Sequence, residues 1–304
     1  MSAAASDNAD QVEYWNGDVG RKWVRNQDRL DRAFRPLTAA LVECAAPRRG
    51  ERAIDVGCGC GELSLALADH LGAGGRVVAV DVSRPMLDHA ELRGRAQAAE
   101  GQAAIEWQEA DAASWPFPEA GFDLLVSRFG VMFFGDPAAA FRNLRRALRP
   151  GGRLAMLCWR PLQDNPWVAI PRAAMLQVLP APDPVPPHAP GPFAFADAAR
   201  VGAILAQAGF AEIASVTADA PLEVATLQGS TDDAALDAAV QFAVEVGPAS
   251  ALLRDIDEAT RKRAMRAVRE ALRDRARQNR PLLDAACWLY TAINPEMGSG
   301  SSGP

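Results

Sequence analysis

The sequence predicts an α/β fold in which a mostly parallel sheet of seven strands is flanked by helices and carries helical insertions. An apolar run over residues 53–56 breaks into a glycine-rich turn and resumes with leucines at helical spacing. Further strand-like runs follow at 76–82, 104–110 and 122–127, with helical periodicity between them. Strands that alternate with helices in this way indicate a parallel sheet.

The composition argues against several classes of protein. The chain has 304 residues, 49% hydrophobic and 23% charged, which is ordinary for a globular protein of one large domain or two small ones. A net charge of −6 disfavours a nucleic-acid partner, and no apolar run is long enough for a membrane span. Residues 1–10 lack a secretion-signal pattern and the five cysteines lack metal-ligand spacing, so we expect a cytoplasmic protein with free thiols.

The glycine-rich turn after the first strand has the spacing G-x-G-x-G, at Gly57, Gly59 and Gly61. Glycines allow a tight turn and a close approach of the backbone to a ligand. Asp55, inside the strand end, would serve a pyrophosphate poorly and a ligand with an ammonium group well. A tight turn in some other α/β protein is the alternative. The stretch from Asp55 to Gly61 resembles the first motif of class I S-adenosylmethionine (SAM) methyltransferases, which implies that Asp55, Gly57, Cys58, Gly59 and Gly61 contact the cofactor.

The second strand, 76–82, ends in a carboxylate, Asp81. A carboxylate at this position can accept hydrogen bonds from both ribose hydroxyls of a nucleoside. The alternative is a carboxylate that caps the next helix, since Ser83 and Pro85 follow, and Asp81 and Ser83 can divide the two roles between them. Asp81-x-Ser83-x-x-Met86 is similar to the second motif of the same methyltransferases. That resemblance implies that Met86 packs against the adenine and places Val82 in the cofactor site.

Two further segments complete the predicted cofactor site. Asp111 and Ala112 follow the third strand, where the same family uses an acidic residue to accept the exocyclic amine of adenine; a bare turn is the alternative. The fourth strand ends at residue 127, and ligands of open α/β sheets bind outside the carboxyl ends of the strands. From this end we assign Ser127 and Arg128 to the cofactor and Phe129, Met132 and Phe133 to the substrate pocket.

For Phe133 and its neighbour Phe134, filling the core beneath the next helix is the alternative. That helix is predicted to begin after Asp136. Residues 148–154 contain a Pro-Gly-Gly turn into the fifth strand, which also resembles the methyltransferase pattern. The resemblance therefore covers residues 53–158 and implies a Rossmann-like, seven-stranded sheet whose last strand is antiparallel.

The N-terminal residues 11–45 are predicted to be helical. Their apolar spacing fits simple packing. In the family that the chain resembles, however, such a segment closes over the cofactor, and on that basis Trp23 and Gln27 are placed near it.

The second half of the chain is expected to add cap insertions and two strands. A helix over 165–179 precedes a proline-rich loop, and Trp159 and Trp167 are assigned to the substrate pocket. We expect an N-terminal helical lid (1–45), a SAM-binding core (46–160), a cap insertion with the proline-rich loop (161–192), a continuation of the core (193–226), a helical cap insertion (227–280), a last strand (281–295) and a flexible tail or tag (296–304).

Methyl transfer needs few protein groups because SAM carries an activated methyl on its sulfonium. Positioning supplies much of the rate, and a base is needed only if the acceptor must lose a proton. His70 and His89 are expected on helices away from the cleft, so His188 in the proline-rich loop is the catalytic candidate. We expect no metal site.

The predicted function is SAM-dependent methylation of a small, fairly apolar molecule, with oxygen, nitrogen or carbon left open as the acceptor atom. The protein is expected to be a monomer or homodimer. A non-catalytic SAM-binding protein remains an alternative. An NAD(P)-dependent oxidoreductase is disfavoured by the G-x-G-x-G spacing and by Asp55.

Overall fold

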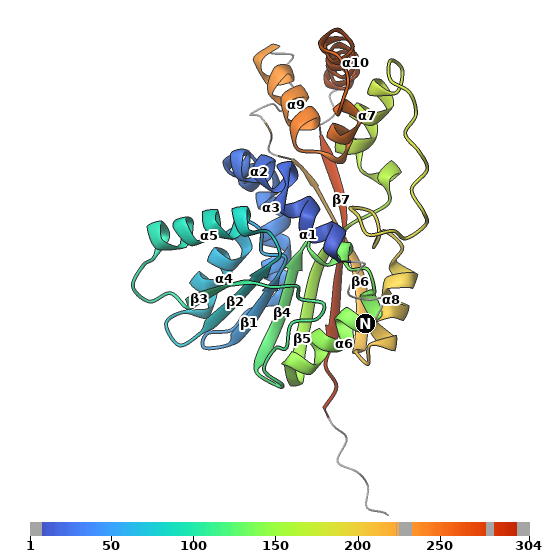
Figure 1. Ribbon diagram of the computed structural model, residues 1–304. Coiled ribbons are helices and arrows are strands. Elements are labelled where there is room, and N and C mark those ends of the chain that lie inside the picture. Colours follow the sequence, from blue (N-terminus) through green and yellow to red (C-terminus); the bar gives the residue numbers. More distant parts are fainter. Residues whose placement is uncertain (1–7, 223, 225–232, 278–282, 297–304) are drawn as a thin grey trace, which may run out of the picture.

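The computed structural model describes residues 8–222, 224, 233–277 and 283–296. Its centre is a seven-stranded sheet in the order β3-β2-β1-β4-β5-β7-β6 (Figure 1). Strands β1 to β5 pair in parallel, whereas β7 pairs antiparallel with both β5 and β6. This topology confirms the predicted sheet and its antiparallel last strand. The strands are β1 (Arg52–Val56), β2 (Arg76–Asp81), β3 (Ala104–Glu109), β4 (Phe122–Arg128), β5 (Leu148–Trp159), β6 (Ala211–Pro221) and β7 (Asp284–Ile293).

Helices cover both faces of the sheet. Helix α4 follows β1 and α5 follows β2, and right-handed crossovers place both on one face, where α3 packs against α4. Helices α6 and α8 pack together on the other face. The helices near the sheet are α1 (Ala9–Asn16), α2 (Asp18–Arg25), α3 (Gln27–Ala45), α4 (Glu62–Leu71), α5 (Arg84–Gln97), α6 (Pro137–Ala147) and α8 (Ala198–Gln207).

The core explains why these segments fold as predicted. Strands β1 and β2 are buried along nearly their whole length, as expected for parallel strands covered on both faces. Helix α3 buries Leu30, Phe34, Leu37 and Leu41, which recur at helical spacing, and it packs against β4 and β5. Helix α3 therefore belongs to the layer that covers the sheet, and α1 and α2 precede it as a separate helix pair.

A helical cap lies beyond the carboxyl ends of the parallel strands, at the top of Figure 1. It consists of α7 (Pro166–Met175), α9 (Asp233–Glu245) and α10 (Glu258–Arg277), which pack against one another. Short 3₁₀ helices lie at η2 (Val131–Phe133), η3 (Leu162–Asp164) and η4 (Pro248–Leu253). The predicted tail at 296–304 falls almost entirely outside the described residues.

The Pro-Gly-Gly segment at 150–152 forms an irregular turn as predicted, although the bounds of β5 already begin at Leu148. The pairing of β5 with β4 shifts register between Leu148 and Arg153, and Gly151 has a φ of +72°. The segment is held in the sheet by the chain that follows β7: the Gly151 N–H donates to the Asn294 carbonyl, and the Asn294 N–H donates to the Gly152 carbonyl. Among the described residues, no helix combines the length and apolar character that crossing a membrane requires.

Candidate active site

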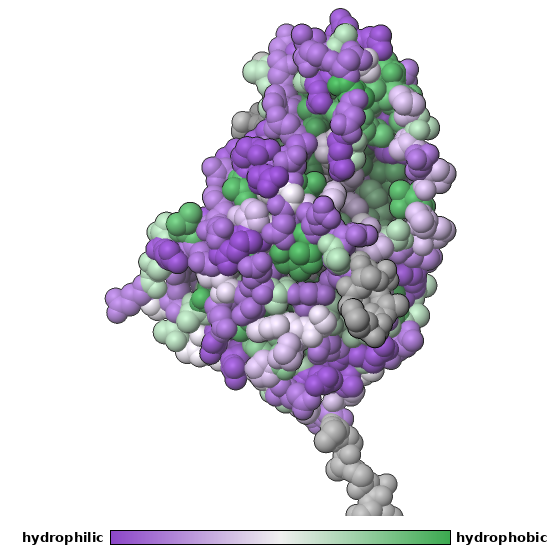
Figure 2. All heavy atoms as spheres, viewed as in Figure 1, coloured by the Kyte–Doolittle hydropathy of each residue, from purple (hydrophilic) through white to green (hydrophobic). Residues whose placement is uncertain are grey.

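A large cavity, of about 920 Å³, lies at the carboxyl ends of the central strands. Its walls come from the segments that follow β1, β2, β3 and β4, from the end of β5, and from α1, α2 and the α9–η4 region. Figure 2 shows that the outer face is largely hydrophilic, with hydrophobic side chains gathered in a hollow on the side of the cap. The cavity thus occupies the position where ligands bind in open α/β sheets.

The glycine turn after β1 is shaped by close backbone packing. Gly57, Gly59 and Gly61 have φ angles of +69°, +56° and +87°, which residues with a side chain rarely adopt. A Cβ on Gly57 would lie 2.6 Å from the Cα of Gly130, so the turn contacts the segment after β4 directly. Gly57 and Gly59 line the cavity. Gly61 instead packs against the ring of Trp107, which a Cβ would approach to 2.7 Å.

Asp81 connects the glycine turn to the loop that follows β2. Its Oδ2 accepts the Gly59 N–H and its Oδ1 accepts the Ser83 N–H, each at 2.8 Å. Burial raises the pKa of this carboxyl, and the backbone hydrogen bonds oppose that shift. The idea that Ser83 shares the capping of α5 through its side chain was wrong. Its hydroxyl makes no cap bond and donates instead to the Trp15 carbonyl at 2.7 Å.

Asp55 lies at the floor of a second, small cavity of about 40 Å³, together with Gln27, Cys58 and Arg128. The Ser64 hydroxyl donates to Oδ2 of Asp55 at 2.6 Å. Oδ1 is buried and accepts no hydrogen bond from any described residue. Burial raises the pKa of Asp55 to about 7, although the Ser64 bond and the charge of Arg128 oppose the rise. An ammonium group would satisfy this carboxylate.

Arg128, the last residue of β4, lines both cavities. Its guanidinium donates to the Thr38 hydroxyl at 2.6 Å and pairs with the carboxylate of Glu62 at the start of α4. Burial lowers the pKa of Arg128, and the charges of Asp31 and Asp55 oppose that change. The guanidinium is therefore held in a fixed position beside Asp55.

An aromatic wall forms another side of the large cavity. The rings of Phe129 and Trp159 stack at 3.9 Å, and Trp159 contacts Trp167 at 4.9 Å. Phe34 packs edge-on against Phe129 at 5.7 Å. Met132 also lines the cavity. This wall provides a flat apolar surface of the kind that binds aromatic or aliphatic ligands.

The two alternatives for Phe133 and Phe134 both hold in part. Both side chains line the large cavity. Phe133 contacts the ring of Trp15 on α1 at 5.1 Å. Phe134 also packs against Phe141 of α6 at 5.9 Å, beneath that helix as the core alternative expected.

Most residues that the sequence assigns to the site lie at one of the two cavities. The large cavity is lined by Trp23, Gly57, Gly59, Asp81, Val82, Met86, Asp111, Ala112, Arg128, Phe129, Met132, Phe133, Trp159 and Trp167. The small cavity adds Gln27, Asp55 and Cys58. Asp111 also shapes its turn, because Oδ1 accepts the Ala113 N–H at 3.0 Å.

Three assigned residues, Gly61, Ser127 and His188, line neither cavity. The Ser127 hydroxyl donates to the Val56 carbonyl at 2.8 Å and so joins β4 to β1. His188 is exposed on the proline-rich loop, so its placement gives no support for a catalytic base. The N-terminal helices and the 227–280 cap insertion were expected to cover the cleft, and α1 and the α9–η4 region do line the large cavity. Sequence reasoning named no individual site residue there, such as Tyr14, because no local motif indicates one.

The described residues contain no group of three or more His, Cys, Asp or Glu side chains that could hold a metal ion. The side chains that line the large cavity include carboxylates, guanidinium groups, an amine, hydroxyls and an aromatic surface.

Comparison with known proteins provides separate evidence on the family of this chain. Residues 53–152 match a family model described as a methyltransferase domain. The chain is 36% identical, over 116 residues, to 2-phytyl-1,4-naphtoquinone methyltransferase of Synechococcus elongatus, covering 38% of this chain and 49% of that protein. It is 34% identical, over 127 residues, to nocamycin O-methyltransferase of Saccharothrix syringae, covering 40% and 43%. The matched stretch thus spans about half the length of these relatives.

Among solved structures, the [4+2]-cyclase SpnF is similar, with a TM-score of 0.50 and 20% identity over 86% of this chain and 81% of that one. At this identity the likeness concerns the fold alone. The sequence matches coincide with β1 to β5 and with the motif residues around the two cavities. Residues 53–152 of the chain therefore match a methyltransferase domain of the class I, S-adenosylmethionine-dependent kind.

Proposed function

We propose that this protein transfers a methyl group from SAM to a small, fairly apolar molecule. The observation that carries the proposal is that Asp81, Met86 and Asp111 of the family's motifs and an aromatic wall line one cavity of about 920 Å³. A cavity of this volume is at the upper end of the range for small-molecule sites. It has room for two ligands side by side.

The residues fit the cofactor at three points. Asp81 would accept the ribose hydroxyls, and Asp111 the exocyclic amine of adenine. At the amino-acid end, the unpartnered Oδ1 of Asp55 suits an ammonium group and Arg128 suits a carboxylate. Bound SAM supplies an electrophilic methyl on a sulfonium. The protein's part is to hold the acceptor in line and to exclude water.

The aromatic wall supports an apolar acceptor. Phe129, Trp159 and Trp167 offer a surface on which a flat ring can stack. One relative is named for a naphtoquinone, which is a ring-containing acceptor, and another is named as a nocamycin O-methyltransferase. No histidine is among the described residues that line the large cavity, so any base for the acceptor would have to come from another side chain of the lining, such as Glu13, Tyr14 or Glu245.

A second candidate is a SAM-binding protein that does not transfer methyl groups. It is favoured by one observation: the fold is shared with a protein named for a cyclisation, so the fold alone does not determine the reaction. Both candidates require the same cofactor residues and differ in turnover. We also propose a cytoplasmic protein without a nucleic-acid partner, which the net charge of −6 supports.

The test has two stages. Calorimetric titration with SAM, S-adenosylhomocysteine and NADH should show binding of the two adenosyl ligands alone. The protein is then incubated with methyl-labelled SAM and a panel of quinols, phenols, amines and carboxylic acids. Transfer of label to a panel member supports the methyltransferase. Adenosyl binding without transfer favours the second candidate, and binding of NADH alone overturns both.

A further inference from the structure

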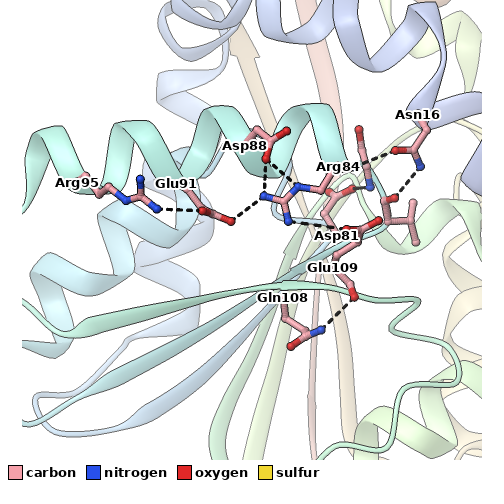
Figure 3. Close-up of polar contacts among 10 residues, drawn as sticks. Asn16, Asp81, Arg84, Asp88, Glu91, Arg95, Gln108 and Glu109 are labelled. Atoms are coloured by element: carbon pink, nitrogen blue, oxygen red, sulfur yellow. Dashed lines mark hydrogen bonds and ion pairs between the residues drawn. The ribbon is translucent and has the colours of Figure 1, made fainter.

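The turn between α1 and α2 is joined to the loop after β2 by three hydrogen bonds. The side-chain amide of Asn16 donates to the Val82 carbonyl at 2.8 Å and accepts the Arg84 N–H at 3.0 Å. The Ser83 hydroxyl donates to the Trp15 carbonyl at 2.7 Å. Figure 3 shows Asn16 reaching from the end of α1 to the start of α5, next to Asp81. We call these three bonds the clasp.

The loop held by the clasp is the one that positions Asp81. The Ser83 N–H donates to Oδ1 of Asp81, while the hydroxyl of the same serine donates to the Trp15 carbonyl. One residue thus contacts both the carboxylate proposed for the ribose and the N-terminal helix pair. Any movement of the helix pair away from the loop must break the clasp.

The helix pair forms one side of the cavity. Trp15 and Trp23 line it and pack edge-on at 5.9 Å, and Trp15 also contacts Phe133 at 5.1 Å. The fit is tight at Gly20, where an added Cβ would lie 2.0 Å from the Trp15 carbonyl oxygen and 2.9 Å from the Ser83 hydroxyl. The helix pair and the loop therefore meet without spare space.

Asn16 itself does not line the cavity, so its effect on a ligand is indirect. Its amide suits the clasp because it carries donors and an acceptor together. One donor bond goes to the Val12 carbonyl within α1 and another to Val82, while the oxygen accepts from Arg84. A carboxylate could keep only the bond from Arg84, and an alanine could keep none.

We propose that Asn16 is a positioning residue for cofactor retention: the clasp keeps the helix pair closed over the cofactor, and its opening sets the rate at which the adenosyl ligand leaves. This inference rests on the proposed function only in requiring an adenosyl ligand. It does not require an acceptor or turnover.

The experiment measures dissociation of S-adenosylhomocysteine by stopped-flow tryptophan fluorescence, with hydrogen exchange of residues 9–25 in the saturated protein. We expect Asn16→Ala to raise the dissociation rate by about five- to a hundredfold, as the loss of two hydrogen bonds implies. Asn16→Asp should have an intermediate effect. The association rate should change by less than about threefold, because such changes act mainly on dissociation.

Two further variants separate the clasp from general destabilisation. Ser83→Ala removes the bond to Trp15 independently and should also raise the dissociation rate. Val12→Ala shortens an exposed side chain on the same helix and should leave the dissociation rate unchanged. When SAM is varied, Asn16→Ala should raise KM for SAM, and kcat at saturating SAM should stay the same or rise.

If S-adenosylhomocysteine dissociates from both Asn16→Ala and Ser83→Ala at the wild-type rate, the clasp does not determine cofactor retention and the proposal is overturned. Faster exchange of residues 9–25 without faster dissociation would do the same. If the wild-type protein binds no adenosyl ligand, the proposed function itself fails and this inference fails with it. The two failures are therefore distinguishable.

Discussion

Ser64 on α4 donates its hydroxyl to one carboxylate oxygen of Asp55 at 2.6 Å and leaves the other oxygen buried and without a partner among the described residues. Burial of polar oxygen without a hydrogen bond is costly. Burial raises the pKa of Asp55 to about 7, because the ionised carboxylate is the form that loses most from burial. The pair thus forms a site that is completed by a cationic group.

Asp55 should make both stability and cofactor binding depend on pH. Its pKa in the folded protein lies above the ordinary 3.8, so the folded state binds the proton more tightly. Stability of the ligand-free protein should therefore fall as pH rises from about 4 to about 7. Binding of an ammonium group requires the carboxylate, so affinity should rise as Asp55 ionises, by about five- to tenfold from about pH 6 to about pH 7.5.

Calorimetry of S-adenosylhomocysteine binding in buffers of different ionisation enthalpy checks this point. Proton release is expected at about pH 6 in the wild type and should be absent in Asp55→Asn. Equal proton release in the two proteins would assign the titration to another group.

Asp81→Asn should weaken SAM binding by roughly tenfold to a few hundredfold, because a charged acceptor of the proposed ribose bonds is lost. The Gly59 and Ser83 N–H groups bond to different oxygens of Asp81, and asparagine replaces one of these oxygens with an NH2 group, so one N–H loses its acceptor. The matched control is Asp123→Asn. Asp123 lies near the first residue of β4, at the end of the strand opposite to Arg128, and its carboxylate accepts the Arg52 N–H. The control should lose stability and keep its affinity; equal affinity loss in both would refute the ribose assignment.

Gly20→Ala should weaken SAM binding by about five- to a hundredfold, because the added methyl has no room beside the Trp15 carbonyl and the helix pair must shift. Gly202→Ala on α8 is the matched control, since nothing lies within 4 Å of its Cβ position. That control should raise stability by about 0.5–1 kcal/mol and leave binding unchanged. Calorimetry and thermal unfolding distinguish the two variants.

His188→Asn should leave turnover within about twofold of the wild type, since the side chain is exposed and lines neither cavity. Asparagine is chosen because residue 188 has a φ of 63°, which asparagine tolerates better than alanine. A general base would contribute about 10²–10⁴-fold. A loss of that size, measured with any acceptor that the labelled-SAM panel identifies, would restore His188 as the base.

The strands, the crossover helices and the cofactor motifs could be predicted because their signals are local. The apolar run before Gly57 and the carboxylate at the end of β2 follow from neighbouring residues alone. Parallel strands bring their carboxyl ends to one edge, so Asp55, Asp81 and Asp111 could be assigned to one site without knowledge of side-chain contacts.

The tertiary structure decided which side chains face that site. Ser127 and Arg128 are adjacent on β4, yet the first bonds to the Val56 carbonyl and the second lines both cavities, because successive residues of a strand point to opposite faces. The proline-rich loop carries His188 on the exterior, and no periodicity determines where such a loop runs.

The sequence by itself thus determined the strands of the sheet, the glycine turn after β1, and the resemblance to methyltransferases that use SAM as the cofactor. Only the tertiary structure decided that Asn16 meets Val82 and Arg84, and that Arg128 is held between Thr38 and Glu62. Hydrogen bonds between residues far apart in the chain depend on how whole helices pack, and packing is set by the complementary surfaces of many side chains together. A local sequence pattern therefore cannot predict which distant residues will form these hydrogen bonds.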